Sequence, residues 1–198
     1  MLPTIRHSLR ESAMDEPVKK IAVVQGAPSA LVQTLFQELT QRWQASGRLA
    51  GVVAEDHGLP DRACSAGYLR SLSDGERYPI FQDLGAGSKG CHLAGDGAAV
   101  AAAAVRRDIA AGCDLVVLSK FGKLEAGGGG LRDAFGAAIE AGVPVLTSVS
   151  PAYVAAWEAF ATPLFVVLPA AAERIDAWWR SLRSPVAAVP AGRVSAHL

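Results

Sequence analysis

The most chemically suggestive stretch of the sequence is SKFGKLEAGGGGLRDAF, which spans residues 119–135 and directly follows the apolar run 114–118. It combines two lysines, a glutamate, an arginine and four consecutive glycines. An isolated lysine is usually a solvated charge. Lysines that follow a buried strand can instead hold their ammonium groups over the crevice where a sheet binds anionic ligands. The stretch therefore predicts an oxyanion-binding site.

Individual residues of this stretch have different predicted roles. Glu125 can orient a lysine through an ion pair, or act as a general base toward water, which makes it the candidate catalytic residue. The glycines at 127–130 can let a lid move or let the chain pass close to a ligand. The residues that we expect to contact the ligand are Ser119, Lys120, Gly122, Lys123 and Arg132.

Two other loops offer groups to the same kind of ligand. The loop QGAPS, residues 25–29, leads from a predicted strand into a predicted helix, with Gly26 and Ser29 as candidates and Ser29 as the expected N-cap. A helix N-terminus favours anions through its unpaired N–H groups and its dipole, although an ordinary strand-to-helix turn is the preferred explanation of the loop. The loop QDLGAGSKGCHL supplies Ser88 and Lys89 among glycines that permit a nest of N–H donors, and a solvated surface loop is the simpler alternative.

Apolar runs and helical patterns alternate along the chain and would position these loops. Such alternation implies a parallel sheet covered on both faces, with ligands beyond the carboxyl ends of its strands. Two further runs flank an Asp–Gly pair, which predicts one inserted antiparallel hairpin. The expected strands are 20–24, 49–54, 114–118, 143–149 and 164–168, the hairpin strands are 68–72 and 76–81, and the expected helices are 30–46, 98–111, 131–141, 152–160 and 170–182.

Composition limits the possible classes of protein. The 198 residues are 51% hydrophobic and carry a formal net charge of +0, which argues against a general affinity for nucleic acid. No run approaches the roughly 20 apolar residues that span a bilayer, and the first residues do not resemble a signal peptide. Three cysteines without metal-ligand spacing indicate free thiols in a reducing cytoplasm and no metal site. We expect one α/β domain over residues 20–182, between a flexible N-terminal tail at 1–19 and a C-terminal tail at 183–198.

Three segments together resemble a known family. The order QDLGAGSKGC, CDLVVLSKFGKLEAGGGGLRDAF and AGVPVLTSVSP is similar to an uncharacterised bacterial family often encoded beside molybdate ABC transporters. The resemblance covers roughly residues 20–182 and implies a link to molybdenum but no known activity. The order of the elements also resembles the small P-loop nucleoside triphosphatases of thermophiles and animals. That likeness implies a three-layer, P-loop-NTPase-like fold with a mostly parallel central sheet.

Departures from the P-loop pattern argue against hydrolysis that depends on Mg²⁺. Counted from Gly26, the second glycine, the lysine and the hydroxyl of GxxxxGK[ST] would fall at Leu31, Val32 and Gln33. The acidic pair that ends the matching strand in those enzymes is replaced by Ser–Lys at 119–120. These changes remove the charge stabilisation that phosphoryl transfer needs.

Three functions stay open on the sequence alone. The leading one is a cytoplasmic protein that binds phosphate, sulfate, molybdate or a nucleotide and serves molybdenum handling or its regulation. The second is a metal-independent phosphohydrolase in which Lys120 and Lys123 replace the metal and Glu125 positions water. The third is a non-catalytic scaffold, possible as a homodimer, with Trp178 and Trp179 as its contact surface, although such aromatic side chains more often belong to a core.

Overall fold

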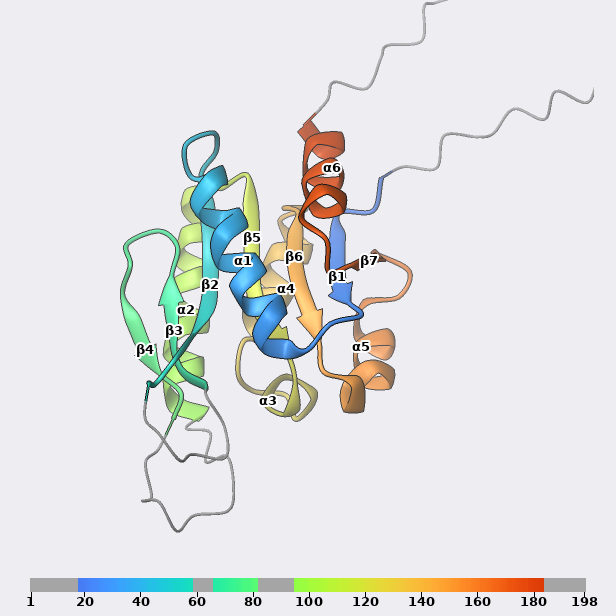
Figure 1. The fold of residues 1–198 in the computed structure, drawn as a ribbon. Helices are drawn as coiled ribbons and strands as arrows, with labels where there is room; N and C mark the ends of the chain where they lie inside the picture. Colours follow the sequence, from blue (N-terminus) through green and yellow to red (C-terminus); the bar gives the residue numbers. More distant parts are fainter. Residues whose placement is uncertain (1–17, 59–65, 82–94, 184–198) are drawn as a thin grey trace, which may run out of the picture.

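A computed structural model describes residues 18–58, 66–81 and 95–183 of the chain (Figure 1). Within these residues, seven strands form one sheet in the order β4-β3-β2-β5-β6-β1-β7. The strands are β1 (Ile21–Gln25), β2 (Leu49–Asp56), β3 (Ala66–Ser71), β4 (Arg77–Pro79), β5 (Leu115–Phe121), β6 (Val145–Val149) and β7 (Phe165–Pro169).

Most of the sheet is parallel, as the sequence predicts. Strands β2, β5, β6, β1 and β7 pair in parallel, whereas β3 runs antiparallel to β2 and β4 antiparallel to β3. The central strands are continuous apolar runs because helices cover both of their faces. The predicted hairpin is also present, and Gly75 in its turn has a φ of +78°, which suits glycine. The predicted α/β fold with an inserted hairpin is confirmed.

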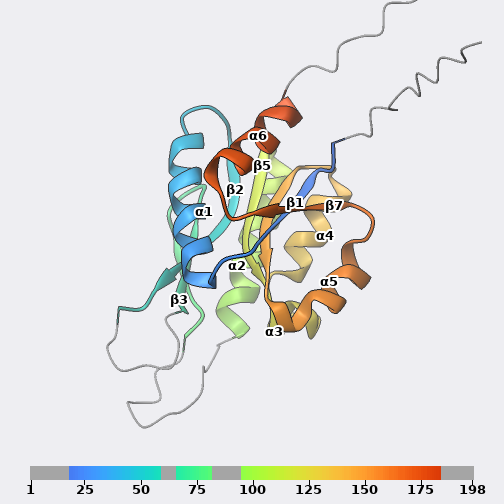
Figure 2. The same ribbon diagram turned by 45° about the vertical axis from the view of Figure 1, so that its right-hand side comes forward.

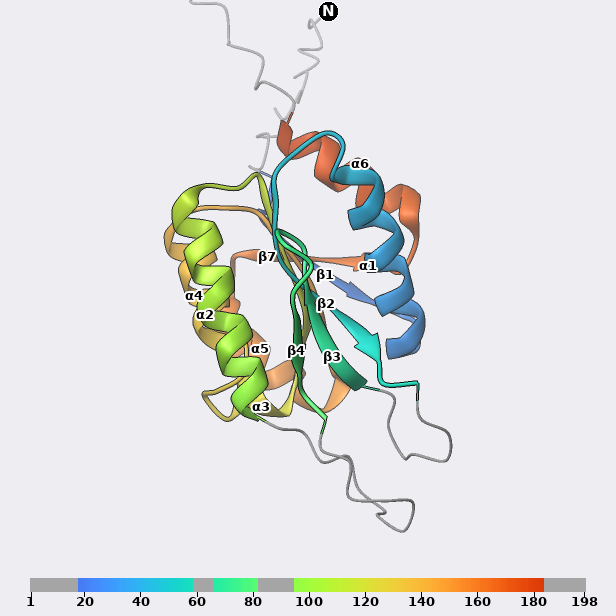
Figure 3. The ribbon, with the colours of Figure 1, turned by 90° about the vertical axis from the view of Figure 1, so that its left-hand side faces the viewer.

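Helices form a layer on each face of the sheet (Figures 2 and 3). Figure 3 views the sheet edge-on, with α1 and α6 on one face and α2, α4 and α5 on the other. Two separate groups of buried apolar side chains match these two layers. The helices are α1 (Ser29–Trp43), α2 (Gly95–Ala111), α3 (Lys123–Ala126), α4 (Arg132–Glu140), α5 (Val154–Ala161) and α6 (Ala172–Arg183), and a 3₁₀ turn (Pro151–Tyr153) precedes α5.

Tryptophans anchor both layers of the core. Trp157 of α5 packs against Phe121 and Phe135, with ring centroids 5.2 and 5.5 Å away. On the opposite face, Trp178 and Trp179 of α6 are 6% and 3% exposed. The prediction that this pair belongs to the core is therefore confirmed, and two side chains so deeply buried do not present a contact surface.

Two predicted boundaries are wrong in ways that bear on the site. Ser29 is the first residue of α1 and not its N-cap, because Pro28 takes the cap position with a φ of −55° and no side-chain cap bond. Strand β5 continues through Ser119 and Lys120 to Phe121. Phe121 is completely buried, and burial of its ring gives the strand a reason to extend past the predicted end at residue 118.

Other sequence predictions concern the membrane, the thiols and the tails. None of the described helices is long and apolar enough to cross a membrane. Cys113 is a free, half-buried thiol whose pKa is raised by its burial, while Cys64 and Cys91 lie outside the described residues. Residues 1–17 and 184–198, which make up most of the predicted tails, also lie outside them.

Candidate anion-binding site

The connection from β1 to α1 presents backbone donors. The first bond of the helix runs from the Val32 N–H to the Pro28 carbonyl oxygen, over 3.2 Å. The N–H groups of the three preceding residues, 29–31, therefore have no partner within the helix. With no side chain capping them, these groups and the helix dipole favour an anion at the start of α1.

A β-bulge ends β5 and sets the direction of Lys120. Leu118 pairs with Thr147 and Phe121 with Val149, so three steps along β5 match two steps along β6. The extra residue interrupts the alternation of side chains, which is how bulges redirect them. Within β5 the Lys120 side chain is exposed, while Ser119 and Phe121 on either side of it are buried.

The carbonyl oxygen of Ser119 in β5 accepts hydrogen bonds from two other elements, α1 and β6. Gln33 Nε2 of α1 donates to it over 2.8 Å, and Ser148 Oγ of β6 donates to it over 2.9 Å. Gln33 stands where a P-loop would have its metal-binding hydroxyl, and it makes a neutral contact to the strand end instead. These two bonds fix the start of α1 against the ends of β5 and β6.

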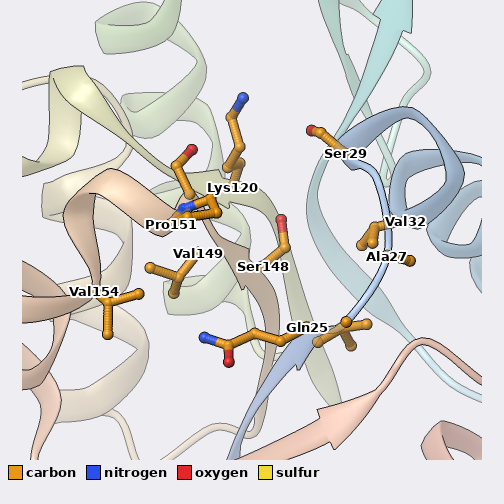
Figure 4. Close-up of a pocket in the computed structure, with 12 residues that line it drawn as sticks. Gln25, Ala27, Ser29, Val32, Lys120, Ser148, Val149, Pro151 and Val154 are labelled. Atoms are coloured by element: carbon orange, nitrogen blue, oxygen red, sulfur yellow. The ribbon is translucent and has the colours of Figure 1, made fainter.

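These elements enclose a cavity of about 230 Å³, which we call the α1 cavity (Figure 4). It lies between the neighbouring strands β1 and β6, at the point where α1 leaves toward one face of the sheet and α5 toward the other. Ligands of open α/β sheets bind at such a switch point. The lining residues are Val24, Gln25, Gly26, Ala27, Ser29, Val32, Lys120, Ser148, Val149, Ser150, Pro151 and Val154.

The structure brings together some of the predicted site residues. Gly26, Ser29 and Lys120 all line the α1 cavity. Ser119 does not line it, but its carbonyl oxygen accepts a hydrogen bond from the lining residue Ser148. Figure 4 shows Lys120 and Ser29 on opposite sides of the opening, with Ser148 between them. The cationic side chain and the start of α1 therefore border the same cavity.

Other predicted residues lie on α3 or next to it, since Gly122 precedes α3, Lys123 and Glu125 lie within it, and Arg132 begins α4. Gly122, Lys123, Glu125 and Arg132 do not line the α1 cavity. Lys123 is exposed, and Arg132 Nη1 donates to the backbone oxygen of Glu125 over 3.0 Å. The remaining two candidates, Ser88 and Lys89, lie outside the described residues.

Glu125 is a buried carboxylate of α3 that connects the start of α3 to the α3–α4 turn. It is 6% exposed, and its Oε2 and Oε1 accept the N–H groups of Gly122 and Leu131 over 2.8 and 2.9 Å. Gly130, with a φ of +59°, passes so close that a Cβ there would lie 2.3 Å from Glu125 Oε1. The glycine run therefore lets the chain fold tightly around a carboxylate. The expected role of the glycine run as a lid and the expected role of Glu125 as a general base stay predictions.

Residues that sequence reasoning missed complete the cavity. Gln25, Ser148, Ser150 and Pro151 line it, and Gln33 supports it from α1. The available signal was the segment TSVSP, whose hydroxyls lie at the carboxyl end of a predicted strand and hence on the same rim as the other loops. Among residues 18–58, 66–81 and 95–183, no group of three or more His, Cys, Asp or Glu side chains could hold a metal ion.

Comparison with known proteins places the chain in a family. A family model described as "Protein of unknown function (DUF2478)" matches residues 21–178. The chain belongs to this family. The matched span contains every residue of the α1 cavity, and the predicted membership of an uncharacterised family is confirmed.

A curated protein that is similar to this chain has a name that refers to molybdenum import. Over 166 residues the chain is 34% identical to "Molybdenum import ATP-binding protein ModC 2" of Bradyrhizobium diazoefficiens. The match covers 83% of this chain but 18% of the relative, so the chain spans about a fifth of that protein's length. No solved structure matches the chain.

Gly26 allows a test of the backbone conformation of the β1–α1 loop at the cavity. Its φ is +89°, which side chains rarely adopt, yet a Cβ there would meet no atom within 4 Å. We therefore expect Gly26→Ala to destabilise the protein by about 1–2 kcal/mol through backbone strain alone. Urea unfolding measures this loss. Gly26→Asn should lose less, because asparagine tolerates positive φ, and equal losses for the two variants would contradict the explanation.

Proposed function

We propose that this protein binds a tetrahedral oxyanion, or the phosphate group of a nucleotide, in the α1 cavity. The observation that carries the proposal is that Lys120 and the start of α1, where no side chain caps the N–H groups, line one cavity. An ammonium group and backbone N–H donors that converge on one space form charge-assisted hydrogen bonds with an anion. The bond from Gln33 to Ser119 supports the proposal, because it holds these donors in place before a ligand arrives.

The size of the cavity favours a small ligand. Its volume of about 230 Å³ lies below the range of roughly 300–1,000 Å³ that is typical of pockets for drug-sized molecules. An ion such as phosphate or molybdate can enter completely. A nucleotide would place a phosphate group in the cavity and keep its sugar and base outside.

A role in molybdenum handling is the biological context that we propose for this binding. Its support is the printed name of the relative, which describes molybdenum import and ATP binding. Since the chain spans about a fifth of that relative, either property can belong to another part of the relative. The proposal therefore concerns the oxyanion first and molybdenum second.

Binding is better supported than hydrolysis. The phosphohydrolase hypothesis needs Glu125 to position water, but both of its carboxylate oxygens accept backbone N–H groups, one before α3 and one in the α3–α4 turn. Glu125 also does not line the α1 cavity. A carboxylate used in this way supports the fold more directly than it supports chemistry on a ligand.

Lys120→Ala tests the proposal. We expect it to weaken binding of inorganic phosphate, sulfate, molybdate or ATP about tenfold or more, because a hydrogen bond to a charged group contributes about 1.5–3 kcal/mol. Isothermal titration of the full chain with each probe measures the change. The fold should be unaffected, since the Lys120 side chain is exposed.

Substitutions of two other cationic residues test whether Lys120 acts through direct contact with the anion or only through the net charge of the protein. Lys123 is exposed and outside the cavity wall, so Lys123→Ala should weaken binding by no more than about threefold through screened electrostatics. Arg106, exposed on α2, provides a control with the same change of charge. Equal losses in all three variants, or no binding of any probe by the natural protein, would remove the proposal.

A further inference from the structure

The Ser148 side chain is a polar group in the wall of the α1 cavity whose hydrogen is already used. Ser148 is 6% exposed, and its Oγ lies 2.9 Å from the carbonyl oxygen of Ser119. A carbonyl oxygen carries no hydrogen, so the hydroxyl of Ser148 must be the donor in this bond. Figure 4 shows the same oxygen pointing toward the side of the cavity where Lys120 and Ser29 lie. Toward the cavity, Ser148 therefore presents lone pairs only.

Neighbouring contacts hold the hydroxyl in this orientation. The Ser119 carbonyl lies in the bulge of β5 and also receives the amide of Gln33, so its position is fixed from two sides. Turning the hydroxyl toward the cavity would break a buried hydrogen bond. The remaining amide oxygen, Gln33 Oε1, is buried without a partner among the described residues. Around Ser119, acceptors thus exceed donors.

Lys120 and the start of α1, which lie on either side of Ser148, have the reverse character. Lys120 and the N–H groups at the start of α1 are donors without acceptor capacity. A well-matched ligand is therefore anionic where it faces these donors and carries a hydrogen where it faces Ser148 Oγ. At neutral pH, sulfate and molybdate carry no hydrogen, and an oxygen of either would place its lone pairs against those of Ser148 Oγ. Inorganic phosphate keeps at least one acidic hydrogen under the same conditions.

We propose that the α1 cavity selects a tetrahedral oxyanion that retains a proton, the hydrogen phosphate class, over fully deprotonated sulfate and molybdate. This inference rests on the proposed function and names the class of ligand within it. The P–O–H group of the ligand donates to Ser148 Oγ, while its charged oxygens accept from Lys120 and from the start of α1. Selectivity arises because the wrong ion leaves the buried acceptor without a partner.

A comparison of three anions tests the inference on the full chain. Isothermal titration near neutral pH should give a dissociation constant for inorganic phosphate at least about tenfold lower than those for sulfate and molybdate. Ser148→Ala removes the acceptor. We expect the preference to fall to about threefold or less, because phosphate loses affinity while sulfate and molybdate do not.

Substitution of a second serine in the same wall is the matched control for Ser148→Ala. The Ser150 hydroxyl lines the cavity and makes no side-chain hydrogen bond among the described residues, so it can donate or accept. Ser150→Ala should weaken all three anions by similar factors and keep the preference. A preference unchanged by Ser148→Ala would overturn the inference.

If Ser148→Ala does not fold, the anion affinities of the natural protein still test the inference. Sulfate or molybdate bound as tightly as phosphate would overturn the inference and leave the proposed function standing. Absence of binding by all three anions and by ATP would instead remove the proposed function itself.

Discussion

Replacing Gly51 by alanine should destabilise the protein by about 4 kcal/mol or more, the largest effect that we expect from a single methyl group. Gly51 lies in β2 and pairs with Val117 of β5. Its φ is +111°, and a Cβ there would lie 2.0 Å from the backbone oxygen of Val117 and 2.7 Å from its nitrogen. Both strands are central and buried, so backbone atoms and not a flexible side chain would have to move. Strain and overlap therefore add at this position.

Urea unfolding measures the loss as a fall in the midpoint. With a typical slope of roughly 1–3 kcal/mol per molar urea, a loss of this size moves the midpoint by more than about 1 M. Gly136 in α4 is the control, because a Cβ there meets nothing within 4 Å. Gly136→Ala should stabilise the protein by about 0.5–1 kcal/mol. A Gly51→Ala variant within about 1 kcal/mol of the natural protein would show that the close approach of β2 and β5 is wrong.

The fold could be predicted from local patterns because each buried parallel strand is a short, continuous apolar run. The run before Ser119 and the Asp–Gly pair of the hairpin are both signals that neighbouring residues carry. The need for glycine at position 51 is different. It depends on how closely another strand approaches, which no local pattern in LAGVVAED reveals.

The site could be predicted in outline but not in its contacts. Strand ends and helix starts mark the rim of the sheet, which is why Gly26 and Lys120, both of which line the cavity, could be predicted at this rim. The bond from Gln33 to Ser119 joins residues 86 positions apart, and the bond from Ser148 joins residues 29 positions apart. Such pairs are decided by the order of strands and by the bulge in β5. The position of Ser148 at a strand end indicated the rim of the sheet but not this bond, and no local pattern marked Gln33.

Glu125→Gln should destabilise the protein by about 2–3 kcal/mol while leaving affinity for oxyanions within about threefold. Both carboxylate oxygens accept backbone N–H groups, from Gly122 and from Leu131. A glutamine offers one oxygen and one NH₂ group, so one of these donors would face another donor inside a buried turn. The loss combines a charge-assisted bond with an unsatisfied N–H group.

The same substitution separates a structural glutamate from a catalytic one. A general base would lose turnover in Glu125→Gln at nearly unchanged stability, whereas a carboxylate that organises the α3–α4 turn loses stability and keeps binding. Thermal or urea unfolding and phosphate titration on the same sample therefore give opposite patterns for the two roles. Glu140→Gln, at an exposed position on α4, is the control and should change stability by no more than about 0.5 kcal/mol. Full stability of Glu125→Gln, together with lost phosphate release from a nucleotide, would reverse the preference for binding over hydrolysis.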